Sequence, residues 1–165
     1  MKKIISIMLI IAAIATLVLP ITASAANNKE DDTYFTQEEF ESLEHIYANN
    51  PQTSNIRATG LITNNRLGIA KRGTTLKITG YTEGNSEVVK CGFKEVVIQR
   101  RASTSASWSD YKTYEDLYSE SAKYTLNKSL TVATGYQYRV TAIHYAKKSL
   151  FSTQKIEVAT GYLTF

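Results

Sequence analysis

The amino-acid sequence predicts an all-β protein, an antiparallel β-sandwich, and three observations lead to this fold class. From Arg57 onward, short β-branched runs replace helical spacing. Turn residues such as Arg72-Gly73 and Thr134-Gly135 separate the runs, and no proline interrupts them. Several short strands at this spacing, with no helix between them, are typical of a sandwich or barrel.

The first 25 residues have the order of a secretory signal peptide. Two lysines precede an apolar run at 4–19, and Pro20 and a small-residue triplet at 23–25 follow. The charged start stays on the cytoplasmic side, the apolar run enters the translocon, and the small side chains fit the peptidase. We therefore expect cleavage between Ala25 and Ala26 and a secreted protein, released or associated with the cell wall.

The alternative for this segment is an uncleaved membrane anchor. Its sixteen apolar or small residues approach the roughly 20 that span a bilayer. Pro20 breaks the run, however, and Lys29 is followed by acids rather than by a basic stop-transfer cluster. Cleavage would leave a mature form of one-domain size with no stable membrane span.

Charge divides the rest of the chain into an acidic arm at 26–55 and a basic body at 56–165, which we expect to be the sandwich domain. The arm has a net charge of −6 and the body one of +8. Opposite charges attract until salt screens them, so the arm can dock on the body or cover its binding surface. The alternative is that both are ordinary solvated faces.

Within the arm, the sequence predicts a short helix over about 36–48. Thr36 and Glu39 form a capping box, and Phe35 and Phe40 have the spacing of a hydrophobic staple. A stripe at helical spacing follows, formed by Phe40, Leu43, Ile46 and Tyr47. Because about a dozen residues make a marginal helix in water, we expect this helix to lean on the body or on a partner.

The body contains six strand-like runs separated by short turns. The expected strands are Thr74–Tyr81, Val88–Arg101, Tyr111–Leu117, Lys123–Val132, Tyr136–Tyr145 and Phe151–Thr160. The expected turns are Asn64-Asn65, Arg72-Gly73, Glu83-Gly84-Asn85, Thr134-Gly135 and Gly161.

One segment favours a sandwich over a barrel. Period-two alternation places Tyr136, Tyr138, Val140 and Ala142 on one face of a strand, and Leu130 lies six residues before the first tyrosine. This pattern resembles the tyrosine corner of fibronectin type III and immunoglobulin-like domains, in which the phenol bonds back to the backbone. The sequence departs from type III domains in lacking their usual prolines and in having Gly80 near the position of their buried tryptophan.

A wider resemblance includes the same segment. Gly135–Val140, His144-Tyr145, Arg57–Gly60 and Thr160-Gly161 resemble a family of small exported proteins of Gram-positive bacteria that has no assigned activity. The resemblance implies export and a β domain, and it carries over no catalytic residue.

The sequence offers little catalytic chemistry. Cys91 is the only cysteine, so no internal disulfide holds the fold, and its apolar neighbours predict a buried thiol rather than an intermolecular pair. His144 falls on the predicted inward face, where a structural role is expected, and His45 is expected to be exposed. These residues are too few for a zinc site, and no phosphate or dinucleotide motif is present. We expect no catalytic residue, no metal ligand and no cofactor.

A binding surface is the remaining possibility. Tyrosine, tryptophan and arginine supply much of the energy at interfaces. The candidate residues are Arg100, Arg101, Trp108, Tyr111, Tyr114 and Tyr118. The alternative is that these tyrosines are strand formers and the bases guard sheet edges.

These observations predict an exported, non-enzymatic module that binds an anionic cell-wall polymer or another protein. Nucleic acid is a poor partner, because the bases are scattered and the charge is modest. Two other functions remain open: a structural or assembly protein whose acidic helix packs on a neighbour, and a hydrolase with an unrecognised site.

Overall fold

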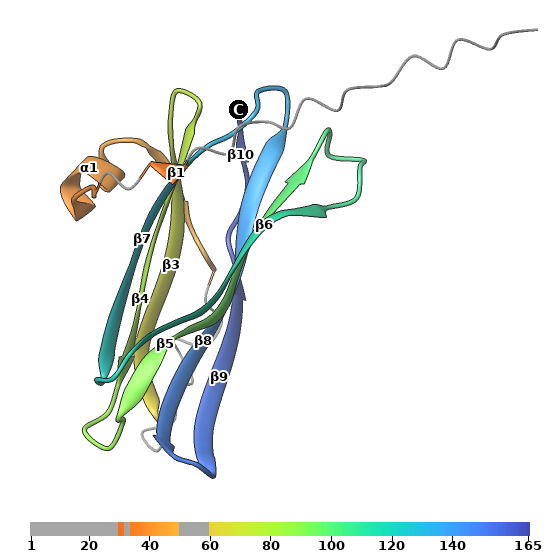
Figure 1. Ribbon diagram of the computed structural model, residues 1–165. Coiled ribbons are helices and arrows are strands. Elements are labelled where there is room, and N and C mark those ends of the chain that lie inside the picture. Colours follow the sequence, from red (N-terminus) through yellow and green to blue (C-terminus); the bar gives the residue numbers. More distant parts are fainter. Residues whose placement is uncertain (1–29, 32–33, 50–59) are drawn as a thin grey trace, which may run out of the picture.

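Two antiparallel sheets packed face to face form the body of the protein (Figure 1). The computed structural model describes residues 30–31, 34–49 and 60–165. In the first sheet the strand order is β1 (Glu30–Asp31), β7 (Lys123–Thr131), β4 (Thr75–Gly84), β3 (Ile62–Arg72) and β2 (Glu44–Tyr47). The all-β sandwich prediction is therefore confirmed.

The second sheet is built around one long strand, β8 (Gln137–Ser149). On one side β8 pairs with β5 (Lys90–Arg101), which in turn pairs with β6 (Ser109–Ser119). On its other side it pairs with β9 (Ser152–Ala159) and, near its start, with β10 (Leu163–Thr164). All six predicted strands are present, with ends that differ by a few residues.

The expected signal peptide, its cleavage site at Ala25 and Ala26 and the membrane-anchor alternative fall on residues outside the described ones. Within 30–31, 34–49 and 60–165, we find no helix with the length and hydrophobicity needed to span a bilayer.

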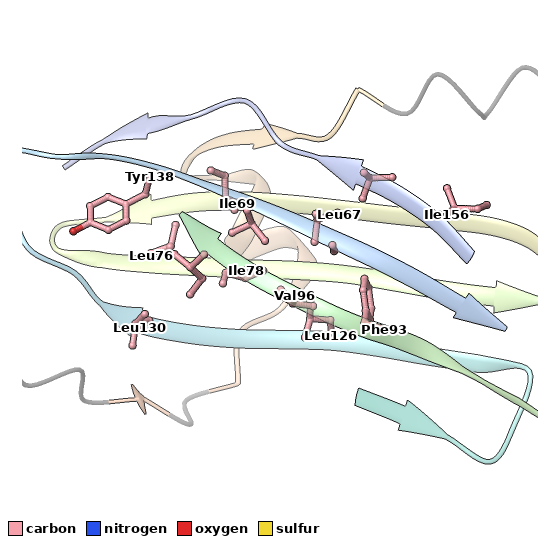
Figure 2. Packing of buried hydrophobic residues seen from close by; sticks show 14 of the residues in the cluster. Leu67, Ile69, Leu76, Ile78, Phe93, Val96, Leu126, Leu130, Tyr138 and Ile156 are labelled. Atoms are coloured by element: carbon pink, nitrogen blue, oxygen red, sulfur yellow. The ribbon is translucent and has the colours of Figure 1, made fainter. Parts of the chain in front are cut away.

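Side chains from both sheets fill the space between them (Figure 2). Along β8 buried and half-buried positions alternate from Gln137 to Lys147, as period two requires. The inward face of this strand consists of Tyr138, Val140, Ala142, His144 and Ala146, so the predicted alternation is confirmed. It meets residues of the first sheet that include Leu67, Ile69, Leu76, Ile78, Leu126 and Leu130.

A tyrosine contact closes one end of this core. The Tyr138 hydroxyl donates a hydrogen bond to the Ala133 carbonyl at 3.1 Å, across the β7–β8 turn. Tyr138 is fully buried, whereas Tyr136, the first tyrosine of the pattern, is half-buried. The bond back to the backbone expected of a tyrosine corner is thus made by the second tyrosine.

The expected turn at Asn64-Asn65 is wrong, because both residues lie in β3. This strand pairs with β4 from Ile62 to Arg72, and the register shifts between Ile62 and Asn64. A bulge accommodates residues that are otherwise poor strand formers. Farther along the strand, the ring of Tyr47 packs closely on Gly68. A Cβ at Gly68 would lie only 2.6 Å from a carbon of this ring, so the contact requires glycine.

The expected helix over 36–48 is confirmed at its start and wrong in its second half. In α1 (Gln37–Glu41), Thr36 Oγ1 accepts a hydrogen bond from the Glu39 N–H at 3.1 Å, which is the threonine half of the predicted capping box, while the Glu39 carboxylate contacts Arg72 and Lys77. The helix ends there, and the following residues form β2, which pairs with β3. The unpaired edge of β3 offers a full row of backbone partners, and this outweighs a marginal helix.

The described part of the arm, residues 30–31 and 34–49, lies against the sandwich. Its strands β1 and β2 form the two edges of the first sheet. In addition, α1 lies against that sheet, where Phe35 and Phe40 are buried with Ala70. Glu39 forms salt bridges with Arg72 at 2.8 Å and with Lys77 at 3.4 Å. Of the two alternatives for the arm, docking on the body is the one observed.

Candidate binding surface

The six candidate residues are dispersed over three places rather than forming one surface. Arg100 and Tyr111 belong to the end of the core. The guanidinium of Arg100 lies 4.8 Å from the ring centroids of both Tyr111 and Tyr136, and Tyr111 packs edge-on against buried Tyr138. Both residues therefore contact the end of the core within their own chain.

Tyr114 and Tyr118 also make intramolecular contacts. Tyr114 packs against the core, and the amino groups of Lys112 and Lys128 lie 4.9 and 5.2 Å from its ring centroid. Tyr118 lies farther along β6, with its ring 5.1 Å from that of Tyr145.

The Tyr118 hydroxyl is tied to a carboxylate, because it donates a hydrogen bond to Asp116 Oδ1 at 3.1 Å. Burial, followed by the hydrogen bond and charge of Asp116, raises the pKa of the Tyr118 phenol well above its usual range. This phenol therefore stays protonated at any physiological pH.

Arg101 and Trp108 meet two residues that the sequence did not single out, Arg139 and Tyr162. The guanidinium carbons of Arg101 and Arg139 lie 4.4 and 4.5 Å from the Trp108 ring centroid. Arg101 also lies 5.0 Å from the ring of Tyr162, which is 41% exposed. We call these four residues the Arg–Trp cluster.

Strand pairing places the two arginines on the outward face of the second sheet. Arg139 follows buried Tyr138 and precedes buried Val140, so its side chain leaves on the opposite face. The register pairs Gln99 with Arg139 and Arg101 with Gln137, which brings the two arginines onto neighbouring strands.

Amide side chains fix the orientation of both guanidinium groups. The Nε–H of Arg139 donates to Gln99 Oε1, and that of Arg101 donates to Gln137 Oε1, both at 2.8 Å. Gln99 is itself held, because its Nε2 donates to Asp110 Oδ1 at 2.8 Å. Arg101 also donates from Nη1 to the Thr104 carbonyl at 3.2 Å.

The cluster has an unbalanced positive charge. Within the part of the chain that the structure describes, neither Arg101 nor Arg139 forms a salt bridge with a carboxylate. Burial, and then the nearby charge of Arg101, lowers the pKa of Arg139. Two like charges are therefore held beside one indole, an arrangement that can accept an anion.

The chemistry of these groups suits a phosphate or carboxylate carried by a sugar or polyol. A guanidinium matches the planar fork of such anions with paired N–H donors. The faces of Trp108 and Tyr162 offer apolar area with a polar edge.

Of the four cluster residues, the sequence identified Arg101 and Trp108. Period two marked Arg139 as outward-facing, but only the β5–β8 register shows that it lies beside Arg101. Tyr162 follows Gly161 in the β9–β10 connection, and no sequence pattern marked it as part of a surface.

The residues with catalytic potential are inside the protein. His144 and Cys91 are both fully buried, as expected. His144 Nδ1 lies 2.7 Å from Thr82 Oγ1, which donates to the Gly92 carbonyl at 2.8 Å, and Cys91 Sγ donates to the Thr82 carbonyl at 3.3 Å. Burial raises the pKa of the Cys91 thiol, the opposite of what an active nucleophile needs.

His45 is half-buried rather than exposed as expected, with Nδ1 2.9 Å from the Leu43 carbonyl oxygen. Over the described ranges, no three His, Cys, Asp or Glu side chains come together as a metal site would require.

Comparison with known proteins adds no relative: no family model, no curated protein and no solved structure matches this chain.

Proposed function

We propose that this chain is an exported, non-enzymatic binding module whose Arg–Trp cluster binds an anionic polymer of the cell surface. The observation that carries the proposal is the position of two guanidinium groups beside Trp108. Arg101 and Arg139 lie on the neighbouring strands β5 and β8, and neither pairs with a carboxylate among the described residues. Preorganised donors of one sign on an outer sheet face are what a polyanion needs.

The rest of the molecule is consistent with this assignment. The body has a net charge of +8, which attracts a polyanion over a longer range than the cluster alone. Export is part of the proposal because residues 1–25 have the order of a signal peptide. The resemblances to fibronectin type III and immunoglobulin-like domains and to exported proteins of Gram-positive bacteria support the same proposal.

The two competing functions receive less support. An assembly role for the acidic helix has less support, because the helix packs on its own sheet through Phe40 and Glu39 pairs with Arg72 and Lys77 of the same chain. A hydrolase needs an accessible base or nucleophile, and His144 and Cys91 are enclosed in the core.

The only tryptophan of the chain provides a direct test, because Trp108 belongs to the proposed site. Titration with poly(glycerol phosphate) should change its fluorescence at about 0.05 M salt and much less at about 0.5 M, where surface charges are screened. Uncharged dextran should cause no change. A response to dextran equal to that of the polyanion would refute an anionic ligand.

A matched pair of variants separates the cluster from general charge. Arg101→Gln with Arg139→Gln should weaken polymer binding by about tenfold or more, because charge-assisted bonds are lost. Lys94→Gln with Lys123→Gln removes the same charge from other surface ion pairs and should weaken binding by less than about threefold. Equal losses in both variants would show that the polymer binds by net charge alone.

A further inference from the structure

The β8–β9 hairpin ends in two apolar side chains that nothing covers. Leu150 is 80% exposed and Phe151 is 99% exposed, and together they form the two-residue turn between Ser149 and Ser152. Hairpin turns normally consist of glycine, asparagine, aspartate or serine, because these suit both the backbone and the solvent. The two large apolar side chains at this position are outside the core.

The tip stands at one extremity of the molecule. In Figure 1 the turn between β8 and β9 lies at the far end from the C-terminus and from β10. The Arg–Trp cluster lies near the start of β8, while the tip follows its last residue. Ten or so residues of extended strand separate them, which corresponds to about 35 Å. The tip is therefore a second surface, independent of the proposed polymer site.

Basic side chains surround the tip. The lysine collar consists of Lys90, Lys147, Lys148 and Lys155, which the β5–β8–β9 pairing brings to the same end. Two carboxylates lie among them, Glu120 paired with Lys90 and Glu87 paired with Lys148. Lys147 and Lys155 form no salt bridge with any described residue, so the collar keeps an excess of positive charge.

We propose that this hairpin tip inserts into the interface of an anionic lipid bilayer. Three features favour a bilayer over a groove on another protein: the tip is convex, its apolar residues are outermost, and lysines lie two to four residues from them along β8 and β9. Apolar side chains enter the acyl boundary while lysines remain at the headgroups, where anionic lipids attract them. Val89, which is 54% exposed and bonds through its N–H to the Lys147 carbonyl, adds apolar area beside the collar.

The test uses the full chain with a reporter at the tip, so that the apolar N-terminal segment cannot account for the result. Ser149→Cys labelled with a polarity-sensitive dye is specific, because the only native cysteine is buried. Vesicles with about one-third phosphatidylglycerol in phosphatidylcholine should raise and blue-shift the emission, and pure phosphatidylcholine should give a several-fold smaller response. Thr134→Cys, an exposed position in the turn at the other end of β8, is the matched control and should not respond.

Variants identify the groups responsible. In the chain labelled at Ser149→Cys, Leu150→Ser with Phe151→Ser should reduce the vesicle-induced change in emission by about tenfold or more, because two large apolar side chains are removed. Tyr34→Ser removes another exposed aromatic residue, at 74% exposure, and should leave this change in emission as it is. Unchanged circular dichroism would show that both variants fold.

Three outcomes would overturn the proposal. The first is no response at Ser149, and the second is an equal response at Thr134, which would indicate adsorption without a preferred end. The third is an unchanged emission response of the tip label in the Leu150/Phe151 variant. None of these results bears on the polymer site, because the Trp108 titration is done without lipid.

Discussion

At the scale of single residues, His144 combines full burial with incomplete hydrogen bonding. Nδ1 must carry the ring proton, because Thr82 Oγ1 directs its own proton to the Gly92 carbonyl and accepts from the imidazole. Nε2 is buried and has no hydrogen-bond partner among the described residues. A second proton on Nε2 would thus be buried without an acceptor, and burial lowers the pKa of His144 to about 3.

This histidine should make stability depend on pH. The folded-state pKa is depressed from the ordinary 6.5, so the contribution is complete above pH 6.5 and is lost as the pH falls towards 3. Between these values the unfolded chain binds a proton that the folded chain does not. The free energy of unfolding should therefore fall by about 1.4 kcal/mol per pH unit.

Urea unfolding at a series of pH values from 7 to 5 measures this effect, with His144→Asn as the control. Asparagine can keep a polar atom near Thr82 but does not titrate. The wild-type protein should lose about 2 kcal/mol more than the variant over this range. Parallel curves for the two proteins would mean that His144 titrates normally in the folded state.

At the scale of elements, a buried lysine couples α1 to the first sheet. Lys77 of β4 is 4% exposed, and its amino group lies 4.2 Å from the Phe35 ring centroid and 3.4 Å from Glu39 Oε1. The helix thus places a carboxylate and an aromatic face over a cation that the sheet cannot expose to water. Removing the carboxylate would leave this charge buried without a counterion.

Glu39→Gln should therefore lower the free energy of unfolding by about 1–2 kcal/mol, less than for a fully buried pair because Glu39 is partly exposed. Lys77→Met in the same chain should recover most of this loss, since no buried cation then remains. A double-mutant cycle in urea measures the coupling, and Glu38→Gln, which changes an exposed carboxylate of the same helix, is the control. Strict additivity would contradict the coupling.

The strands of the body were predictable because each carries its own alternation or β-branched run. Besides the two-residue strands β1 and β10, which were not predicted, the errors concern the β2–β3 pair. β3 contains Asn64, Asn65 and Gly68, which locally favour a turn, and β2 has the spacing of a helical stripe. β2 becomes a strand through backbone bonds to β3, which is distant in the sequence, and β3 is held by β2 on one side and by β4, its hairpin partner, on the other.

At the scale of the whole molecule, the candidate surface was harder to predict than the fold. Composition selected Trp108 and Arg101, which the structure brings together, since these residue types are common at interfaces. It also selected Arg100, Tyr111, Tyr114 and Tyr118, whose contacts are with other parts of the same chain. Arg139 joins the cluster through the β5–β8 register, and Tyr162 through the β9–β10 connection. Sequence patterns specify which face a residue takes, but not its neighbour on the next strand.

One core shared by both sheets also predicts that the molecule unfolds as a unit. The cluster of buried residues runs from Cys91 and Phe93 at one end to Tyr138 and Phe165 at the other. Cys91 and Arg101 lie at opposite ends of β5, so the thiol and Trp108, which contacts Arg101, report on the two ends of the second sheet. A continuous core of this kind gives a cooperative transition in a domain of this size.

Urea titration should therefore give the same midpoint for Trp108 fluorescence, for far-ultraviolet circular dichroism and for reaction of the Cys91 thiol with a disulfide reagent. In native buffer the thiol should react at least roughly a thousandfold more slowly than in urea, because its exposure requires unfolding. Ser149→Cys supplies the control, since its added thiol is on the surface and should react at once. If Cys91 reacted at urea concentrations below the fluorescence transition, the end of the sandwich that carries the β8–β9 tip would be opening separately, and a single shared core would no longer describe the protein.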